Sequence, residues 1–168
     1  MQNVNDKRTD LLPTDEELSR LRHENLGRLL DFVHVAFDRL ALEYLHRAGY
    51  PYIRAAHTHM LRTMRASGAS LTDMAEEAGI SKQAMSKLAA EFERMGFIEW
   101  RDGPPRTIHT TAAGQTLLKY GVLALREAED HYFSEISGEE REILRKLLLR
   151  VSEADSNGRS PTWRRRRA

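Results

Sequence analysis

Five polar side chains that can hydrogen-bond to the edges of DNA bases lie close together in one short stretch. They are Ser81, Lys82, Gln83, Ser86 and Lys87. Gln can bind adenine through two hydrogen bonds, Lys can reach the acceptors of guanine, and Ser can contact a base or a phosphate. Polar side chains of this kind, considered one at a time, are usually just solvated. The prediction that they bind DNA therefore depends on the element that carries them.

The spacing around these residues predicts two short helices joined by a tight turn. Ser70 is a good N-cap for the first helix and Ser81 for the second, and Gly79 stands where the chain must turn sharply at positive φ. Apolar residues three, four and three positions apart form an inward stripe on the second helix: Met85, Leu88, Phe92 and Met95. This is the pattern of a helix-turn-helix, whose second helix enters the major groove and can offer the N–H groups at Ser81–Gln83 to a phosphate.

A β-hairpin is predicted after the second helix. Phe97–Trp100 and Thr107–Thr110 have the composition of short strands, and the segment between them is rich in Gly and Pro. Such a hairpin is the wing of a winged helix. Arg101 and Arg106 flank its tip, from which a guanidinium can enter a narrow, negative minor groove. Alternatively, Arg106 forms an ion pair with Asp102, and the two roles are compatible.

Four helices with apolar stripes are predicted around this block. They span about 15–47, 52–66, 112–136 and 138–152. Ser137 and Glu140 form a capping box for the last of them. One small domain cannot easily bury the stripes of the first and the last two helices, so we expect them to pack against a second copy of the chain. A monomeric helical bundle is the alternative.

The fold class expected is mainly α with a small β wing. The predicted organisation is a flexible arm (1–13), a helical dimerisation region (14–68 and 112–152), a winged helix-turn-helix DNA-binding lobe (69–111) and a disordered basic tail (153–168).

Charge is distributed unevenly along the chain. It has 26 basic and 25 acidic residues, but five of the basic ones lie beyond the last acid, Asp155, which leaves 21 against 25 in the rest. The lobe 69–111 carries five basic and seven acidic residues, a net charge of −2. A nucleic-acid surface must therefore be a local patch, to which Arg54, Arg62 and Arg65 can add. We expect modest, strongly salt-sensitive affinity for DNA.

The residue inventory argues against an enzyme, a metalloprotein and a membrane protein. The absence of Cys removes disulfides and thiolate metal sites, and no GxSxG, Walker A, GxGxxG or HExxH motif is present. The seven histidines lack chelating spacing, since even His57 and His59 face different sides of a helix. We therefore expect no metal and no cofactor. Residues 1–10 are polar and no apolar run is long enough to span a membrane, so we expect a cytoplasmic protein without a signal peptide.

From about Leu26 to Leu148 the sequence resembles the multiple antibiotic resistance regulator (MarR) family. The matching residues are Met74–Ala75, Gly79–Ser81, Met85–Leu88, Glu93–Ile98, the wing, Thr111 and Gly114. The resemblance implies a triangular homodimer, with the N-terminal and last two helices forming the dimer base. It also implies a repressor that releases DNA when a small molecule binds between lobe and base. The residues expected to line that effector pocket are His34, Phe37, His57, Met60 and Met64.

Two functions follow from these observations. The first is a ligand-responsive repressor that binds a pseudo-palindromic operator in double-stranded DNA as a homodimer, through Ser81, Lys82, Gln83, Ser86, Lys87, Arg101 and Arg106. The alternative is a winged-helix protein-interaction module without specific DNA binding, which the acidic balance of the lobe favours.

Overall fold

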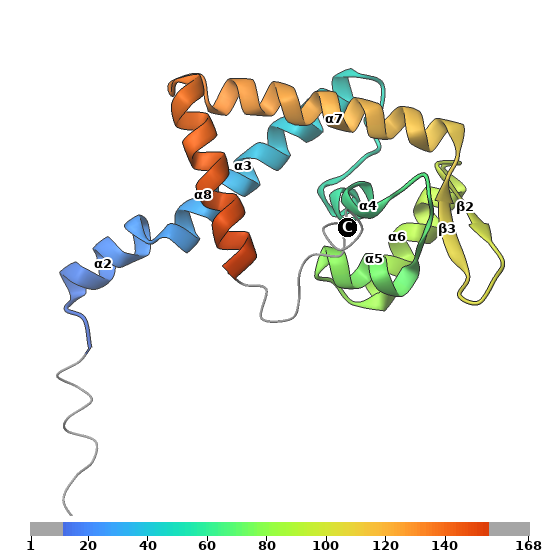
Figure 1. The fold of residues 1–168 in the computed structure, drawn as a ribbon, viewed down its shortest axis with the longest axis horizontal. Coiled ribbons are helices and arrows are strands. Elements are labelled where there is room, and N and C mark those ends of the chain that lie inside the picture. The colour runs from blue at the N-terminus through green and yellow to red at the C-terminus, as the bar shows by residue number, and fades with distance from the viewer. Residues whose placement is uncertain (1–11, 155–168) are drawn as a thin grey trace, which may run out of the picture. The chain divides into compact units, whose positions relative to one another are not determined.

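The described part of the chain, residues 12–154 of this computed structural model, is mostly helical (Figure 1). These described residues divide into two compact units, 12–36 and 37–154. Helix α3 (Leu26–Arg47) begins in the first unit and ends in the second.

In the first unit, the prediction of one continuous helix over 15–47 is wrong. The segment is broken at Asn25, which is extended (φ −68°, ψ 140°) between α2 (Asp15–Glu24) and α3. The side chain of Asn25 stabilises the break from both sides. Its Nδ2 donates to the carbonyl of Leu21 (2.6 Å), and its Oδ1 accepts the amide of Arg28 (2.8 Å). A single Asn thus satisfies backbone groups at the end of one helix and the start of the next.

In the second unit, α3 is followed by a turn, the 3₁₀ helix η1 (Ala55–His57) and α4 (Thr58–Thr63). The prediction of one helix from residue 52 is therefore wrong at its start. Arg54 is extended (φ −115°), and its amide donates to Nδ1 of the His57 side chain (3.1 Å). This bond takes the place of a helical one, so regular helix begins only after His57.

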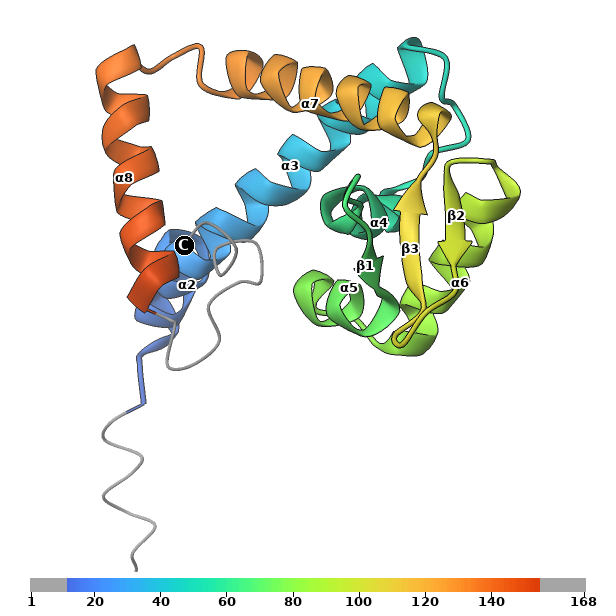
Figure 2. The same cartoon turned by 45° about the vertical axis from the view of Figure 1, so that its right-hand side comes forward.

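The predicted winged helix-turn-helix is confirmed. Its elements are α5 (Leu71–Ala78), α6 (Lys82–Arg94), β2 (Ile98–Arg101) and β3 (Thr107–Thr110), shown in Figure 2. A third strand, β1 (Ala69–Ser70), is too short to leave a pattern in the sequence. The sheet is antiparallel in the order β1-β3-β2, and Ile108 of β3 lies opposite Ala69 on one side and Trp100 on the other.

The turn between α5 and α6 has the geometry that its sequence predicts. Ser70 Oγ accepts the amide of Asp73 and Ser81 Oγ that of Ala84, each at 3.1 Å. Gly79 is left-handed (φ 67°, ψ 27°), a conformation that costs a residue with a Cβ more than it costs Gly. The two caps and the glycine together set where α5 ends and where α6 begins.

Two further helices, α7 (Ala112–Tyr132) and α8 (Gly138–Ala154), complete the described chain. The predicted helix over 112–136 ends early, because Phe133 leaves helical geometry (φ −103°, ψ 19°). The capping box that precedes α8 is confirmed. Ser137 Oγ accepts the Glu140 amide (3.2 Å), and the Glu140 carboxylate accepts the Ser137 amide (2.7 Å).

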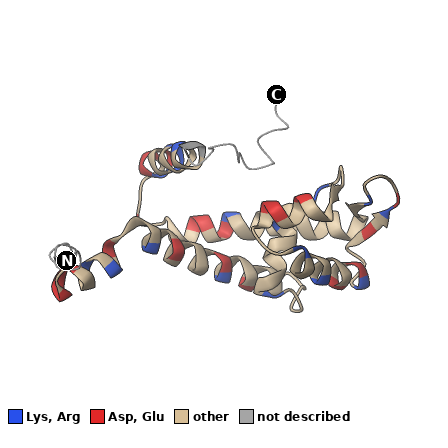
Figure 3. Cartoon of the chain, turned by 90° about the horizontal axis from the view of Figure 1, so that it is seen from below, with Lys and Arg blue, Asp and Glu red and all other residues tan. Residues whose placement is uncertain are grey.

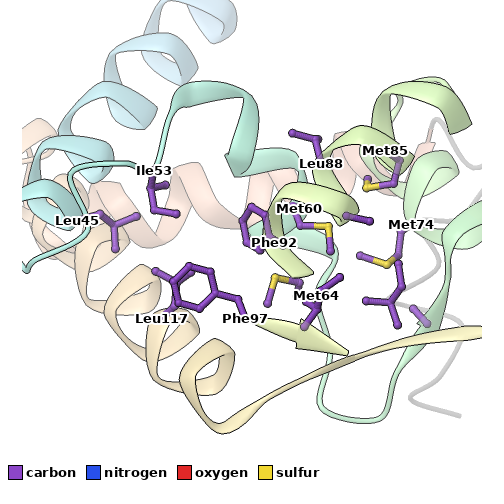
Figure 4. Packing of buried hydrophobic residues seen from close by; sticks show 14 of the residues in the cluster. Leu45, Ile53, Met60, Met64, Met74, Met85, Leu88, Phe92, Phe97 and Leu117 are labelled. Carbon is purple, nitrogen blue, oxygen red and sulfur yellow. The ribbon is translucent and has the colours of Figure 1, made fainter. Parts of the chain in front are cut away.

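The core of the second unit is formed where α4, α5, α6, the sheet and α7 meet (Figure 4). Its most deeply buried large side chains are Ile53, Met60, Met74, Met85, Phe92 and Leu117. Three of the four residues predicted for the inward stripe of α6 are buried, and the fourth, Met95, is partly buried against the core. The stripe therefore determines which face of α6 remains exposed.

The end of α6 is joined to the start of α7 by a compact set of hydrogen bonds. Thr111 Oγ1 donates to the carbonyl of Gly96 (2.6 Å) and accepts the amide of Gly114 (3.1 Å). The Thr111 amide donates to the carbonyl of Phe97 (3.1 Å). Gly114 packs directly on that carbonyl, so a Cβ at this position would overlap its oxygen. The Thr-x-x-Gly spacing seen in the sequence thus has a steric reason.

We expect Gly114→Ala to destabilise the protein by roughly 2–3 kcal/mol, because the added methyl meets backbone that cannot move aside. Gly121→Ala on the same helix is the matched control, since a Cβ there meets nothing within 4 Å. The control should be neutral or stabilise by up to about 1 kcal/mol through helix propensity. Urea unfolding of both variants measures the difference, and equal effects would contradict the close approach at Gly114.

Candidate nucleic-acid interface

All five polar residues predicted at the start of α6 are exposed: Ser81, Lys82, Gln83, Ser86 and Lys87. Met85 and Leu88, which lie between and after them, are buried. The amides of Lys82 and Gln83 precede the first amide held by the Ser81 cap, that of Ala84. The start of α6 therefore presents side-chain donors, side-chain acceptors and backbone N–H groups on one surface.

The wing carries the two predicted arginines, and both are exposed. Arg101 donates to the Glu99 carboxylate at 2.8 and 3.0 Å. The ion pair between Arg106 and Asp102, which the sequence left open, is present at 3.4 Å. The guanidinium of Arg106 also lies over the ring of Trp100, 4.5 Å from its centroid. Sequence reasoning missed this contact, because it depends on how the two strands of the hairpin face each other.

Basic and acidic residues are interspersed along the helices rather than separated (Figure 3). Three arginines expected to add positive potential beside the lobe are each paired with a carboxylate. The pairs are Arg54 with Glu91, Arg62 with Asp38 and Arg65 with Glu77. Lys82 and Lys87 form no ion pair with the residues that the structure describes. The uncompensated positive charge at the start of α6 thus comes from these two lysines.

A cavity of about 270 Å³ lies in the second unit between α3, α4 and α7. Its lining is mostly apolar and includes Leu42, Leu61, Leu118 and Leu125. Two charged residues also line it, and they bind each other: Arg62 Nη2 donates to both carboxylate oxygens of Asp38, at 2.6 and 2.7 Å. The space suits a small, largely apolar molecule such as an aromatic ring.

None of the five residues predicted for an effector pocket lines this cavity. His57, Met60 and Met64 are buried in the core, where their side chains fill the space between helices. Phe37 stacks on Tyr132 with ring centroids 6.5 Å apart. His34 belongs to the other unit. The periodicity of an apolar stripe does not separate residues that fill a core from residues that border a void.

Two of the three comparisons with known proteins found nothing. No protein-family model matches the sequence, and no curated protein matches it.

Solved structures do match. Oxidised MarR from E. coli is 21% identical with a TM-score of 0.67, and the match covers 78% of this chain and 98% of that one. A MarR-family regulator from Rhodococcus sp. RHA1 is 20% identical with a TM-score of 0.59, over 76% and 95%. A MarR-family protein of Mycobacterium tuberculosis in complex with p-aminosalicylic acid is 20% identical with a TM-score of 0.62, over 76% and 98%.

The chain has the MarR fold.

The MarR fold confirms the fold class expected from the sequence. At this level of identity the likeness establishes the fold only, so the roles of individual residues rest on the geometry of this chain. No helix among the described residues is long and apolar enough to cross a membrane. The same residues contain no cluster of three or more His, Asp or Glu side chains arranged to hold a metal ion.

One buried histidine connects the rest of this MarR fold to α6. His57 is 2% exposed, and its Nε2 lies 2.7 Å from Oε2 of Glu91 on α6. The guanidinium of Arg54 binds the same carboxylate oxygen. Hydrogen bonds from His57 and then from Arg54 hold the pKa of Glu91 below its ordinary value of 4.5, although burial acts in the opposite direction. The carboxylate of Glu91 is thus held in its charged form.

The lowered pKa of Glu91 predicts a pH-dependent contribution to stability. A carboxyl whose pKa is depressed on folding stabilises the fold above its unfolded value of 4.5 and loses that effect as the pH falls through the folded pKa. We expect Glu91→Gln to be less stable than the parent chain at neutral pH, with the difference shrinking below pH 4.5. Urea unfolding from about pH 6 to about pH 3 measures this. A difference independent of pH over that range would show that charge on Glu91 does not matter.

Proposed function

We propose that the protein is a MarR-family transcriptional regulator that binds double-stranded DNA sequence-specifically as a homodimer. The observation that supports this most directly is the exposed, uncompensated start of α6 on a MarR fold. Its buried stripe turns the five polar side chains outward together, as insertion into a major groove requires. Repression, with release by a small molecule, is the mode of action that we propose.

Each exposed residue has a role in this proposal. Gln83 and Lys87 contact base edges. The Gln83 amide binds adenine with one donor and one acceptor, and the Lys87 ammonium donates to the acceptors of guanine. Ser81 and Lys82 contact phosphate, as does the N-terminus of α6. Ser86 contacts a base or a phosphate. Arg106 and Arg101 of the wing bind the adjacent minor groove, where phosphates and base edges replace their present carboxylate partners.

Exposed apolar side chains support the homodimer. In the first unit they lie on α2 and the start of α3: Leu18, Leu21, Leu26, Leu29, Leu30, Phe32, Val33 and Val35. In the second unit they lie on α7 and α8: Val122, Leu123, Leu125, Ile143, Leu147, Leu148, Leu149 and Val151. A helix such as α2, with no buried residue, gains little stability from its own short length. Burial against a second copy provides the missing contacts.

The cavity between α3, α4 and α7 is the proposed effector site, in place of the pocket expected from the sequence. It is apolar and of ring size. The Mycobacterium tuberculosis protein of the same fold was crystallised with p-aminosalicylic acid and with salicylic acid. For this chain we propose a small aromatic molecule, which inserts its ring among the leucines beside the Asp38–Arg62 pair.

A protein-interaction module remains the second candidate, and the charge of the lobe favours it. The lobe 69–111 is net negative, and the arginines next to it are neutralised. Acidic surfaces repel DNA phosphates. If no DNA sequence is selected, this function explains the exposed surface better.

Selection from random duplexes at low salt tests DNA recognition. We expect an enriched symmetric motif with half-sites about 10 base pairs apart, which would also establish a two-fold dimer. Lys87→Ala should weaken binding to the motif about tenfold and relax the preference at one base pair. Lys119→Ala is the matched control, because it removes one exposed lysine from α7. The absence of an enriched motif, or equal effects of the two variants, would favour the interaction module.

A second experiment tests the cavity. Gly121 lines it, and a Cβ there meets nothing, so Gly121→Leu should fill the space without disturbing the helix. We expect salicylate and phenol to raise the melting temperature of the parent chain and of Gly121→Ala, and not that of Gly121→Leu. DNA bound by the Leu variant should resist release by the same compounds. Equal responses of all three chains would place the ligand elsewhere.

A further inference from the structure

Both nitrogens of the buried His57 ring have hydrogen-bond partners. Nδ1 accepts the amide of Arg54 (3.1 Å), so the ring proton sits on Nε2. Nε2 then donates to Oε2 of Glu91 (2.7 Å). A buried polar group left without its partner is costly. The ring therefore holds Glu91 in place as long as the fold around His57 is intact.

A second contact fixes the ring against the same helix. The rings of His57 and Phe92 are in T-shaped contact, with centroids 5.4 Å apart and planes at 89°. Phe92 is fully buried and follows Glu91 directly on α6. On the solvent side, the guanidinium of Arg54 binds Glu91 as well. Two consecutive residues of α6 are thus held by one short segment, residues 54–57.

This segment also leads into the wall of the cavity. η1 ends at His57, and α4 begins at the next residue. Thr58, Leu61 and Arg62 of α4 line the cavity. A shift of α4 that accompanies ligand binding would therefore move His57, and with it the carboxylate that holds α6.

We propose that His57 and Glu91 are positioning residues for DNA recognition: their contact adjusts the orientation of α6, and so the placement of Lys87 and Gln83, one and two turns away. The inference rests on the proposed DNA-binding function. It assigns to the buried His57 and its partly exposed partner Glu91 control over how well the start of α6 fits DNA.

The direction in which DNA affinity changes when Glu91 is removed distinguishes a positioning role from a purely electrostatic one. Removing any acid from the lobe raises its net charge from −2 to −1, which by itself should tighten binding to DNA. Positioning by Glu91 predicts weaker binding to the specific site instead. Glu93 is the matched control, because it lies on the same helix, is exposed and forms no ion pair with the described residues.

The experiment compares Glu91→Ala, Glu91→Gln and Glu93→Ala in the full chain, with the duplex found by selection and with a scrambled duplex. We expect Glu91→Ala to weaken specific binding about tenfold and to leave binding to the scrambled duplex unchanged or tighter. Glu93→Ala should not weaken binding to the specific duplex or to the scrambled one. The affinity of Glu91→Gln for the specific duplex should lie between those of the parent chain and Glu91→Ala, because its amide oxygen still accepts from His57. Urea unfolding verifies that each variant is folded under the binding conditions.

His57→Asn provides a second test of the contact. Its amide oxygen can still accept from the Arg54 amide, but the shorter side chain no longer reaches Glu91 as Nε2 does. Combined with Glu91→Ala, it should add little to the loss of specific binding, because both changes remove one interaction. If His57→Asn does not fold, the Glu91 and Glu93 variants decide alone. Tighter specific binding by Glu91→Ala would overturn the positioning role. Failure of the parent chain to select any motif would instead overturn the proposed function and the inference with it.

Discussion

Burial of one stripe on α6 is the constraint on which the rest of the structure depends. Met85, Leu88 and Phe92 pack into the core and thereby determine which face of the helix is turned outward. Everything on the opposite face follows from that. Five polar side chains therefore face outward together: Ser81, Lys82 and Gln83 at the first turn, and Ser86 and Lys87 at the next. A surface built this way is as rigid as the core behind it.

The two ends of α6 are held by different means. At its start, Gly79 and the Ser81 cap define the turn from α5. At its end, Thr111 binds the backbone of Gly96 and Phe97, and Gly114 packs on the Phe97 carbonyl, so that α7 begins in fixed relation to the hairpin. Between these ends, the buried His57 holds the helix by Glu91. The helix is thereby connected to the wing, to α7 and to the segment that leads into the cavity wall.

The charge of the lobe limits the strength of the DNA interaction that we propose. Most arginines near it are engaged by carboxylates, including both arginines of the wing. An arginine that must leave an ion pair to bind phosphate gains less than a free one, because the lost pair offsets part of the new one. Affinity should therefore come from a few well-placed contacts rather than from a strongly positive field. Such contacts agree with the release of DNA by a small molecule that we propose.

The amino-acid sequence by itself determined the local structure of the lobe. Interactions within a few residues specify α5, α6 and the wing: the serine caps, the glycine of the turn, the apolar stripe and the Gly-Pro hairpin. Such local interactions can be predicted from the spacing of residues in the sequence. The sequence was wrong where one polar side chain competes with a helix: Asn25 divides the first helix, and His57 delays the start of α4. Only the tertiary structure decided which apolar residues border the cavity, that Arg106 lies on Trp100, and that His57 reaches Glu91. These contacts join residues far apart in the chain or across a hairpin, and no periodicity of the sequence records which distant side chain a given residue will meet.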